Sequence, residues 1–470
     1  MGKTSLEGFL CVYLLLLVHT VISSAQESAP QSLTLNAAVD LALKNNPAIH
    51  ATQAQAVSAS AGIDLARTAY LPRLDLLWQE NRATRNNISG LLLPQSVIPS
   101  ISGPVLETKS DKPVWGSAAG MLFSWEPIDF GLRKANVDFA HAVKEQANAK
   151  VSVTQLDIAA SAADAFLGVL AADQVVRAAQ ANVERMQTFA RSVHILVDNQ
   201  LRPGVDASRA DAELAVAKNQ LIQAQQTAEI SRATLAETLG LAGTSISIDP
   251  GILLEFPPDT ALISPNFESH PVAIEQKSAL EAVRTREHVL ARSYFPQFNL
   301  QFAFYSRGSG SDPRGQLDGS EGLLPETANW AAGLTVNFQV FEIFNIHARR
   351  QAEASNETAE MARYEQTLQA LKAQEAKAQA LIDAAQRIAE NTPIQLKAAQ
   401  ETEDRSRVRY EAGLATVIEV AEAQHLLVQA EIDNAVARLG VWHALLTVAR
   451  VRGDIKPFLE QSTNSQIQRR

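Results

Sequence analysis

The sequence predicts a mainly α-helical fold with a membrane β-barrel portion, in which each chain contributes a long antiparallel α-helical coiled coil and four β-strands. Three observations predict this fold. The chain is duplicated over most of its length, alanine-rich stretches exceed ordinary helices in length, and four short segments alternate between apolar and polar residues. A duplicated unit with both periodicities is typical of a repeat architecture in which neither copy buries its surface alone.

The duplication predicts the domain organisation. Residues of the first copy recur at one offset, as in Gly120 and Gly333 (333 − 120 = 213). Upstream the offset is larger, as in Pro47 and Pro271 (271 − 47 = 224), so the first copy holds 11 additional residues (224 − 213 = 11). We expect a first structural repeat over residues 26–250, a second over residues 251–454 and a polar C-terminal tail over residues 455–470.

Residues 1–25 have the features of a secretory signal peptide that is cleaved on export. Lys3 precedes an apolar run from Phe9 to Val21, and the small residues ending at Ala25 offer a cleavage site. The run is shorter than the ~20 residues that span a bilayer, which argues against an uncleaved anchor. The only cysteine, Cys11, lies in this segment, so no disulfide is expected in the mature chain. No later segment is expected to span a membrane as a helix.

The chain is acidic and lacks the motifs of common enzymes. Its formal net charge is −10, and nucleic acids bind basic surfaces, so no nucleic-acid partner is expected. The sequence contains no HExxH, GxSxG or nucleotide-binding loop, and its histidines are not spaced as metal ligands. We therefore expect no enzymatic activity, no metal and no cofactor.

Two stretches are expected to form very long helices. Phe130–Asn199 is rich in alanine and contains no proline. At ~1.5 Å per residue, such a helix measures roughly 100 Å. The second long helix is expected over about His347–Ala412, where Pro393 should kink or divide it.

A heptad-like seam follows each long stretch. Small and apolar residues recur there at steps of four and three: Ala210, Leu214, Ala217, Leu221, Ala224 and Ala228 in the first copy, and Ala423, Leu427, Ala430, Ala437, Val441 and Ala444 in the second. Small seam residues let helices approach closely, which favours a packed wall of helices. From the helices alone, a soluble structural coiled coil is an equal alternative.

Four segments are expected to be strands, at about residues 73–80, 117–126, 296–306 and 331–341. The two segments of the second copy alternate between apolar and uncharged polar residues, as a membrane barrel strand does when one face meets lipid and the other a wet lumen, and the two of the first copy follow the pattern more weakly. The residues expected to face lipid are Trp78, Phe123, Trp125, Phe298, Phe302, Phe304 and Phe338. A half-buried strand of a soluble sheet looks alike, but four segments at matching places after a signal peptide favour the membrane.

Four strands cannot close a barrel, because an open edge in lipid would leave backbone groups unpaired. The chain must therefore oligomerise. Three copies would give twelve strands (3 × 4 = 12) and two would give eight (2 × 4 = 8). The connections over about residues 81–112 and 307–329 are rich in Gly, Ser, Pro and Asn and are expected to be exposed outer loops.

Four motifs resemble the TolC-like outer-membrane efflux protein family, over nearly the whole mature chain. They are YLPRL at Tyr70–Leu74, YFPQF at Tyr294–Phe298, WEPIDFGLRKA at Trp125–Ala135 and RYEAGLATVIEVAEAQ at Arg409–Gln424. The resemblance implies a homotrimeric channel in the cell outer membrane that extends into the periplasm. It also implies a passive duct of a tripartite efflux or type I secretion system, supplied by an inner-membrane pump through a periplasmic adaptor.

The last motif implies a gate at the periplasmic helix tips. The residues that match the family's gate region are Asp206, Tyr410, Gly413, Glu419 and Glu422. Glu419 and Glu422 are three apart, so threefold symmetry would build two stacked carboxylate rings that select cations. A solvated helix face is the simpler explanation of this pair.

The gate region departs from the family in two ways. The first turn has Gln200 where the second turn has Gly413. Ala415 stands where some members have an arginine, and Arg202, Arg405, Arg407 and Arg409 are candidates for a substitute ionic latch.

Two other functions remain as alternatives to the duct. A periplasmic adaptor also has paired helices after a signal, but its β-rich domains are not duplicated over the whole chain. A structural coiled-coil tether differs in being soluble without detergent.

Overall fold

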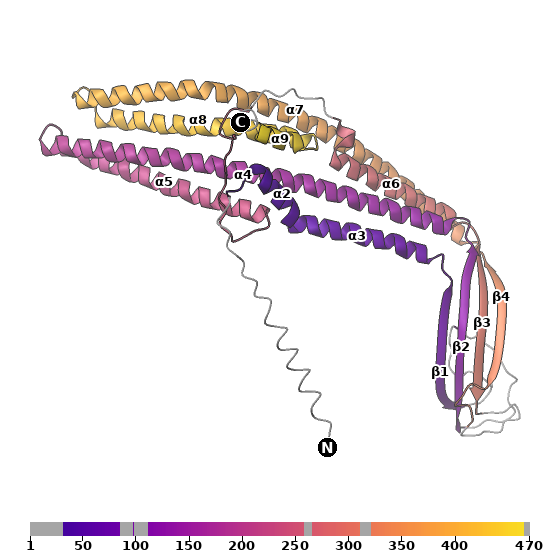
Figure 1. The fold of residues 1–470 in the computed structure, drawn as a ribbon. Helices are drawn as coiled ribbons and strands as arrows, with labels where there is room; N and C mark the ends of the chain where they lie inside the picture. Colours follow the sequence, from indigo (N-terminus) through magenta and orange to yellow (C-terminus); the bar gives the residue numbers. More distant parts are fainter. Residues whose placement is uncertain (1–31, 85–96, 98–110, 258–265, 311–320, 465–470) are drawn as a thin grey trace, which may run out of the picture.

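The computed structural model describes residues 32–84, 97, 111–257, 266–310 and 321–464. Within these residues, long helices run side by side in one elongated bundle, and a four-stranded sheet continues from one end of it (Figure 1). The expected signal peptide and parts of both expected outer loops lie outside the described residues.

The two repeats have the same order of elements. The first consists of α2 (Leu35–Asn45), α3 (Pro47–Thr68), β1 (Arg73–Thr84), β2 (Pro113–Ile128), α4 (Leu132–Asp198) and α5 (Gly204–Thr238). The second consists of the short 3-10 helix η1 (Phe267–Ser269), α6 (Pro271–Arg292), β3 (Gln297–Ser309), β4 (Thr327–Asn337), α7 (Glu342–Glu411) and α8 (Val417–Val451), and α9 (Lys456–Asn464) follows. Helices α3 and α6 each have 22 residues, and α5 and α8 each have 35. The start of α3 is offset by 224 residues from that of α6 (271 − 47), and that of α5 by 213 from that of α8 (417 − 204), as the sequence predicts.

Both very long helices are present. Helix α4 has 67 residues and α7 has 70. Pro393 lies inside α7, which nevertheless continues to Glu411, so the expectation that this proline divides the helix is wrong. A proline removes one backbone donor, and packing along the rest of a long helix outweighs that loss.

Among the described residues, α4 is the one helix whose length and composition alone would allow it to cross a membrane. Half of its most apolar stretch is buried inside the protein, as in the core helix of a bundle. The apolar residues there pack against other helices and form the main core.

The main core lies where α2, α4, α8 and α9 meet in the bundle. Phe166 and Leu167 of α4 are fully buried there with Trp442 of α8. Phe458 of α9 packs edge-on against Trp442, with ring centroids 6.0 Å apart. Residues 455–470 were expected to be a polar tail, but Ile455 and Phe458 are buried and anchor a helix on this core.

The sheet is antiparallel in the order β1-β2-β3-β4, and one of its faces is exposed and apolar. Leu76, Met121, Phe304 and Trp330 lie opposite one another across the four strands and are all exposed. The other face carries the buried Ala118, Ala303 and Tyr305, and Gly120 lies opposite Tyr305, where an added Cβ would be 2.7 Å from the tyrosine Cβ. The expected two-faced strands are therefore present.

One expected strand residue is misplaced. β4 ends at Asn337, so Phe338 follows the strand and lies in the connection to α7. The alternation of the sequence continues past Asn337, but the chain must turn there to begin α7 at Glu342. Trp330, just before the expected segment, lies on β4 and is 71% exposed.

Candidate functional site

The two helix-turn-helix tips lie at the end of the bundle farthest from the sheet (Figure 1). The first tip joins α4 to α5 and the second joins α7 to α8. Each turn places one residue in the left-handed conformation, Gln200 (φ 62°) in the first and Gly413 (φ 77°) in the second. These two positions are equivalent in the repeat (413 − 200 = 213). The predicted role of Gly413 in the turn thus has a backbone reason, since glycine has no Cβ to oppose this conformation.

Tyr410 is the centre of the tip region. Its side chain is 1% exposed and packs with its ring centroid 5.5 Å from that of Phe189. Its hydroxyl donates a hydrogen bond to Oδ2 of Asp206, at 3.2 Å. Burial, together with the negative charge of Asp206, raises the pKa of Tyr410 to about 12. The hydroxyl therefore keeps its proton and remains a donor at physiological pH.

Arg202 makes a second contact with the same tyrosine. Its guanidinium carbon lies 4.4 Å from the Tyr410 ring centroid, and its Nη2 donates to the Tyr410 carbonyl oxygen. Arg202 and Asp206 belong to the first tip, whereas Tyr410 belongs to the second. We call these three residues the latch, because their bonds join the two hairpins.

The latch arginine lies in the first turn, whereas some members of the family have an arginine in the second turn. Arg202 is equivalent to Ala415 in the repeat (415 − 202 = 213), where the resemblance led us to look for an arginine. Among the other candidates, Arg405 pairs with Glu401 at 3.4 Å, and Arg409 donates to the Leu414 carbonyl at 3.2 Å within its own turn. Arg407 pairs with carboxylates of α7 itself. Of the four candidates, Arg202 is the one whose contacts within the described residues reach the other hairpin.

Glu419 has a local partner that the sequence reasoning missed. Its Oε1 accepts a hydrogen bond from the Thr416 N–H at 3.2 Å, and its own N–H donates to Thr416 Oγ1 at 3.3 Å. This reciprocal pair is a capping box at the start of α8, and its T-x-x-E spacing is readable in the sequence. Glu419 and Glu422 are both exposed. The carboxylate rings therefore remain a prediction, with Glu419 also serving as a cap.

Further ion pairs join the two hairpins along their length. Two involve arginine, Arg185–Glu431 at 2.7 Å and Arg450–Asp157 at 2.9 Å. Two involve histidine, His425–Glu213 at 3.2 Å and His443–Asp164 at 3.0 Å. Most of these side chains are partly exposed, so each pair stabilises the contact between the hairpins modestly.

Within the first hairpin, His194 and Asp211 link α4 to α5 near the tip. The His194 Nε2 lies 3.0 Å from Asp211 Oδ1. The hydrogen bond and charge of Asp211 raise the pKa of His194. The equivalent positions of the second hairpin are Arg407 and Gln424 (194 + 213 = 407; 211 + 213 = 424), so the second repeat has no histidine–carboxylate pair at this place.

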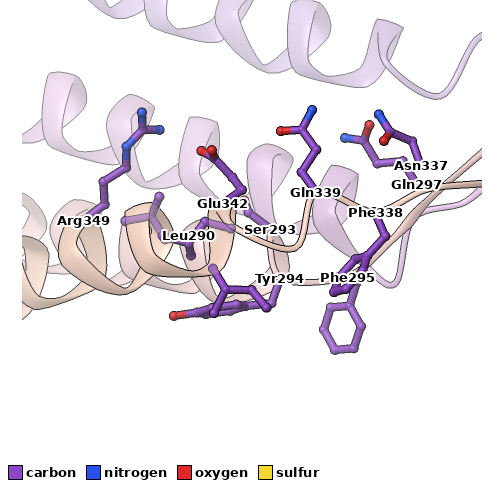
Figure 2. A pocket seen from close by; sticks show the side chains of 12 residues that line it. Leu290, Ser293, Tyr294, Phe295, Gln297, Asn337, Phe338, Gln339, Glu342 and Arg349 are labelled. Atoms are coloured by element: carbon purple, nitrogen blue, oxygen red, sulfur yellow. The ribbon is translucent and has the colours of Figure 1, made fainter.

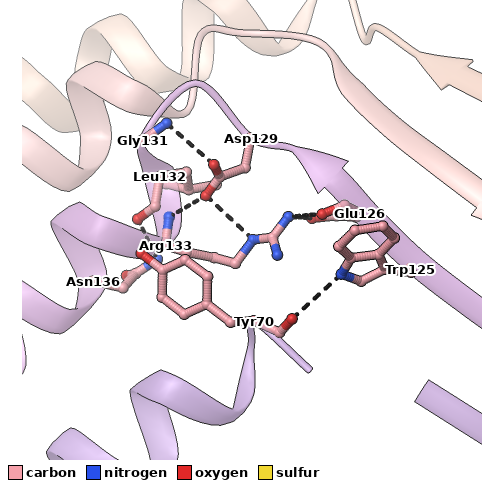
Figure 3. Close-up of polar contacts among 8 residues, drawn as sticks. All are labelled: Tyr70, Trp125, Glu126, Asp129, Gly131, Leu132, Arg133 and Asn136. Atoms are coloured by element: carbon pink, nitrogen blue, oxygen red, sulfur yellow. Dashed lines mark hydrogen bonds and ion pairs between the residues drawn. The ribbon is translucent and has the colours of Figure 1, made fainter. Parts of the chain in front are cut away.

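At the other end of the bundle, an ionic cluster joins β2 to α4 (Figure 3). Arg133 pairs with Asp129 at 3.2 Å, donates to the Glu126 carbonyl and lies over the Tyr70 ring at 5.4 Å. Burial of Asp129 opposes ionisation, but hydrogen bonds from the Arg133 and Gly131 backbone and the charge of Arg133 keep its pKa below the usual value. The WEPIDFGLRKA motif therefore encodes the corner between sheet and helix.

The equivalent corner of the second repeat is a small pocket of about 220 Å³ (Figure 2). Ile346 occupies the place of Arg133 (133 + 213 = 346), and Glu342 that of Asp129 (129 + 213 = 342). Figure 2 shows the polar ends of Glu342 and Gln339 on one side of the chain and Phe295 and Phe338 on the other. Phe338 is thus a corner residue.

Within the described part of the chain, no group of three or more His, Cys, Asp or Glu side chains is placed to hold a metal ion. The polar groups of the latch form hydrogen bonds with one another across the interface between the hairpins.

Comparisons with known proteins agree with this architecture. The family profile described as outer membrane efflux protein matches residues 38–241 and 274–454. Protein CyaE of Bordetella pertussis is 25% identical over 402 residues, which cover 83% of this chain and 78% of that protein. Among solved structures, the Campylobacter jejuni CmeC outer membrane channel superposes with a TM-score of 0.70 at 16% identity, covering 93% of this chain and 90% of that one. The outer-membrane channel OprN superposes with a TM-score of 0.69 at 20% identity, covering 89% of both chains.

Proposed function

Because the chain belongs to the outer membrane efflux protein family, whose members are channels and not enzymes, we propose that three copies assemble into one duct across the outer membrane and periplasm. The duct exports its substrate passively. An inner-membrane pump supplies the energy, and a periplasmic adaptor connects the two. The cleaved signal peptide directs the chain to this location.

The sheet supports assembly from several chains. β1 and β4 are its two edges, and each has one strand partner within the described residues. An edge in lipid leaves backbone N–H and C=O groups without partners, at a cost of several kcal/mol each, roughly. The exposed apolar face, with Trp78, Phe302 and Phe304, suits lipid. Pairing of β1 with β4 of the next chain would close a barrel of twelve strands (3 × 4 = 12).

The helix layer supports the same assembly. α3 and α7 form the outer edges of the layer next to the sheet, since α4 and α6 pack between them. Both edges expose large apolar residues: Val57 and Leu65 on α3 and Phe344 on α7. A second copy would bury these surfaces and continue the wall of helices.

The latch carries the proposal of a gate. Its bonds hold the tip of one hairpin against the other, so the tips must lose these bonds to move apart. Partner proteins that splay the tips would supply that energy. The exposed Leu201 and Leu414 at the two turns offer an apolar contact for an adaptor. Glu419 and Glu422 would line the aperture in threefold symmetry and favour cations.

The test of assembly is the mass of the detergent-purified protein, together with its conductance in planar bilayers. A mass of three chains with discrete channels is the expected result. A protein that remains monomeric and soluble without detergent, with no channel activity, would instead support an adaptor or a structural tether.

A further inference from the structure

A groove lies between α4 and α7, on top of α8 and beside the latch. Its volume is about 600 Å³, within the range of roughly 300–1,000 Å³ that is typical of small-molecule sites. Phe189 and Tyr410 form part of its wall, and Glu184, Glu403, Glu411 and Gln424 supply polar atoms. The groove therefore combines aromatic and acidic surfaces contributed by both hairpins.

Carboxylates exceed cations in and around this groove. Arg185 is engaged by Glu431 through two hydrogen bonds, of 3.0 and 2.7 Å. Arg407 is shared among three carboxylates, as it lies 3.8 Å from Glu403, 3.3 Å from Asp404 and 3.5 Å from Glu411. Of the residues that line the groove, Glu184, Glu403 and Glu411 carry carboxylates and Arg185 and Arg407 carry guanidinium groups, a balance of −1 (2 − 3).

Among the described residues, the groove lining holds one buried acceptor without a partner, Gln424 Oε1, and one buried donor without a partner, Arg185 Nε. Gln424 is 1% exposed, and its Nε2 donates to Glu403 at a long 3.4 Å. Its Oε1 is buried and has no hydrogen-bond partner in the described structure. The hydroxyls of Thr188 and Ser192 donate to carbonyls of their own helix, which leaves their lone pairs for a ligand. A buried acceptor without a donor costs about 1–3 kcal/mol, so a ligand that brings N–H groups would relieve it.

From this combination, we propose that the groove is a binding site for a small organic cation with an apolar body, of the amidinium or guanidinium class. The N–H groups of such a cation would meet Glu403 and Gln424 Oε1. Its apolar body would lie against Phe189 and Leu196, since Arg202 already lies over the Tyr410 ring. The site goes beyond the duct function, since binding requires the two hairpins of one chain.

Benzamidinium chloride is a suitable probe, and neutral benzamide is its matched control because it has nearly the same shape. Titration of the full-length, detergent-purified protein, followed by saturation-transfer NMR of the ligand, measures both affinities. We expect saturable binding of benzamidinium, at least about tenfold tighter than that of benzamide. Equal affinity for the two compounds, or no saturable binding of benzamidinium, would overturn the proposal.

Variants locate the binding in the groove. Glu403→Gln and Gln424→Leu should each weaken benzamidinium binding about tenfold or more, because one removes the charge and the other the unpaired acceptor. Glu184→Gln at the exposed rim should weaken benzamidinium binding about threefold. Because Glu184 is exposed, this variant still tests the proposal if the variants of buried residues fail to fold. Glu390→Gln, an exposed change elsewhere on α7, should leave the affinity unchanged. An affinity indifferent to all of the groove variants would also overturn the proposal.

Discussion

The two tips of this protein have the same fold but differ in what their acidic residue contacts. In the second tip, Glu419 bonds back to Thr416 and caps its own helix. In the first tip the equivalent of Thr416 is Pro203 (416 − 213 = 203), whose side chain cannot take part in a cap. Asp206, the equivalent of Glu419, instead accepts a hydrogen bond from Tyr410 across the hairpin interface. Because Pro203 stands where the second repeat has Thr416, the acid of the first tip has no local cap to form and contacts the other hairpin instead.

The left-handed residues reinforce this difference. Gly413 takes its conformation freely, whereas Gln200 takes it with a side chain, at a cost of about 1–2 kcal/mol. The first turn therefore carries backbone strain that the second turn lacks, while the buried residues of both tips pack together in one cluster.

The largest expected effect is that of Tyr410→Ala. It removes the latch and leaves a cavity beside Phe189, at a cost of about 3–5 kcal/mol to the closed tip. Single-channel recording should show a several-fold larger conductance. The matched control is Val197→Ala at the equivalent position of the first repeat (410 − 213 = 197), which should cost about 1 kcal/mol and leave the conductance small. Equal effects of the two changes would argue against a special role for Tyr410.

Arg202→Ala should have the next largest effect. The change removes the bond to the Tyr410 carbonyl and the contact with its ring, about 1.5 kcal/mol for a partly exposed charged donor. Hydrogen exchange of the tip amides should accelerate in both hairpins, since both lose support. Arg409→Ala removes a bond within the second turn, and its effect should remain in that turn. If exchange after Arg202→Ala accelerates in the first hairpin alone, Arg202 does not connect the hairpins.

Variants of Glu419 distinguish its role as a helix cap from its proposed role in a carboxylate ring. Glu419→Gln keeps a capping box, so the stability of α8 should change little, while cation selectivity should fall. Glu419→Ala should lower selectivity equally and also destabilise the start of α8, by about 1 kcal/mol. Reversal potentials in a salt gradient measure selectivity, and amide exchange measures the helix. Unchanged selectivity in both variants would leave Glu419 as a cap alone.

The smallest expected effect is a pH dependence of the first hairpin. Asp211 raises the pKa of His194, so their pair is fully formed below the ordinary histidine pKa of about 6.5 and is lost as pH rises through the raised value. The protection factors of amides near the first tip, which correct for the base-catalysed intrinsic exchange, should therefore be larger at pH 5.5 than at pH 8. His194→Gln should remove this difference, and His141→Gln on the same helix should keep it. A pH dependence that survives His194→Gln must come from another group.

The fold was predictable from the sequence where a repeating pattern decided it. The offsets of 213 and 224 residues identified α8 as the repeat equivalent of α5 and α6 as that of α3, and alternation located all four strands. Local patterns failed where tertiary packing prevailed. Helix α7 continues through Pro393, and the chain turns at Phe338 although the alternation of the sequence continues past it. Phe458 is buried and anchors a C-terminal segment that was expected to be polar.

The site was predictable in part. The family motif pointed to Asp206 and Tyr410, and the structure brings them together at 3.2 Å. The sequence offered Arg202 as one of four candidate latch arginines, but it could not select among them, because two positions more than 200 residues apart become neighbours only in the packed hairpins (410 − 202 = 208). The capping box of Glu419 could have been read from its spacing to Thr416.

The central claim is that bonds between the hairpins, and not bonds within each tip, hold the duct closed. Single-channel conductance in planar bilayers tests it most directly, with wild type compared to the Arg202→Ala, Tyr410→Phe double variant and to Thr416→Ala. The account predicts a small conductance for wild type and Thr416→Ala and a several-fold larger one for the double variant. The same conductance in all three proteins, or opening by Thr416→Ala alone, would contradict it.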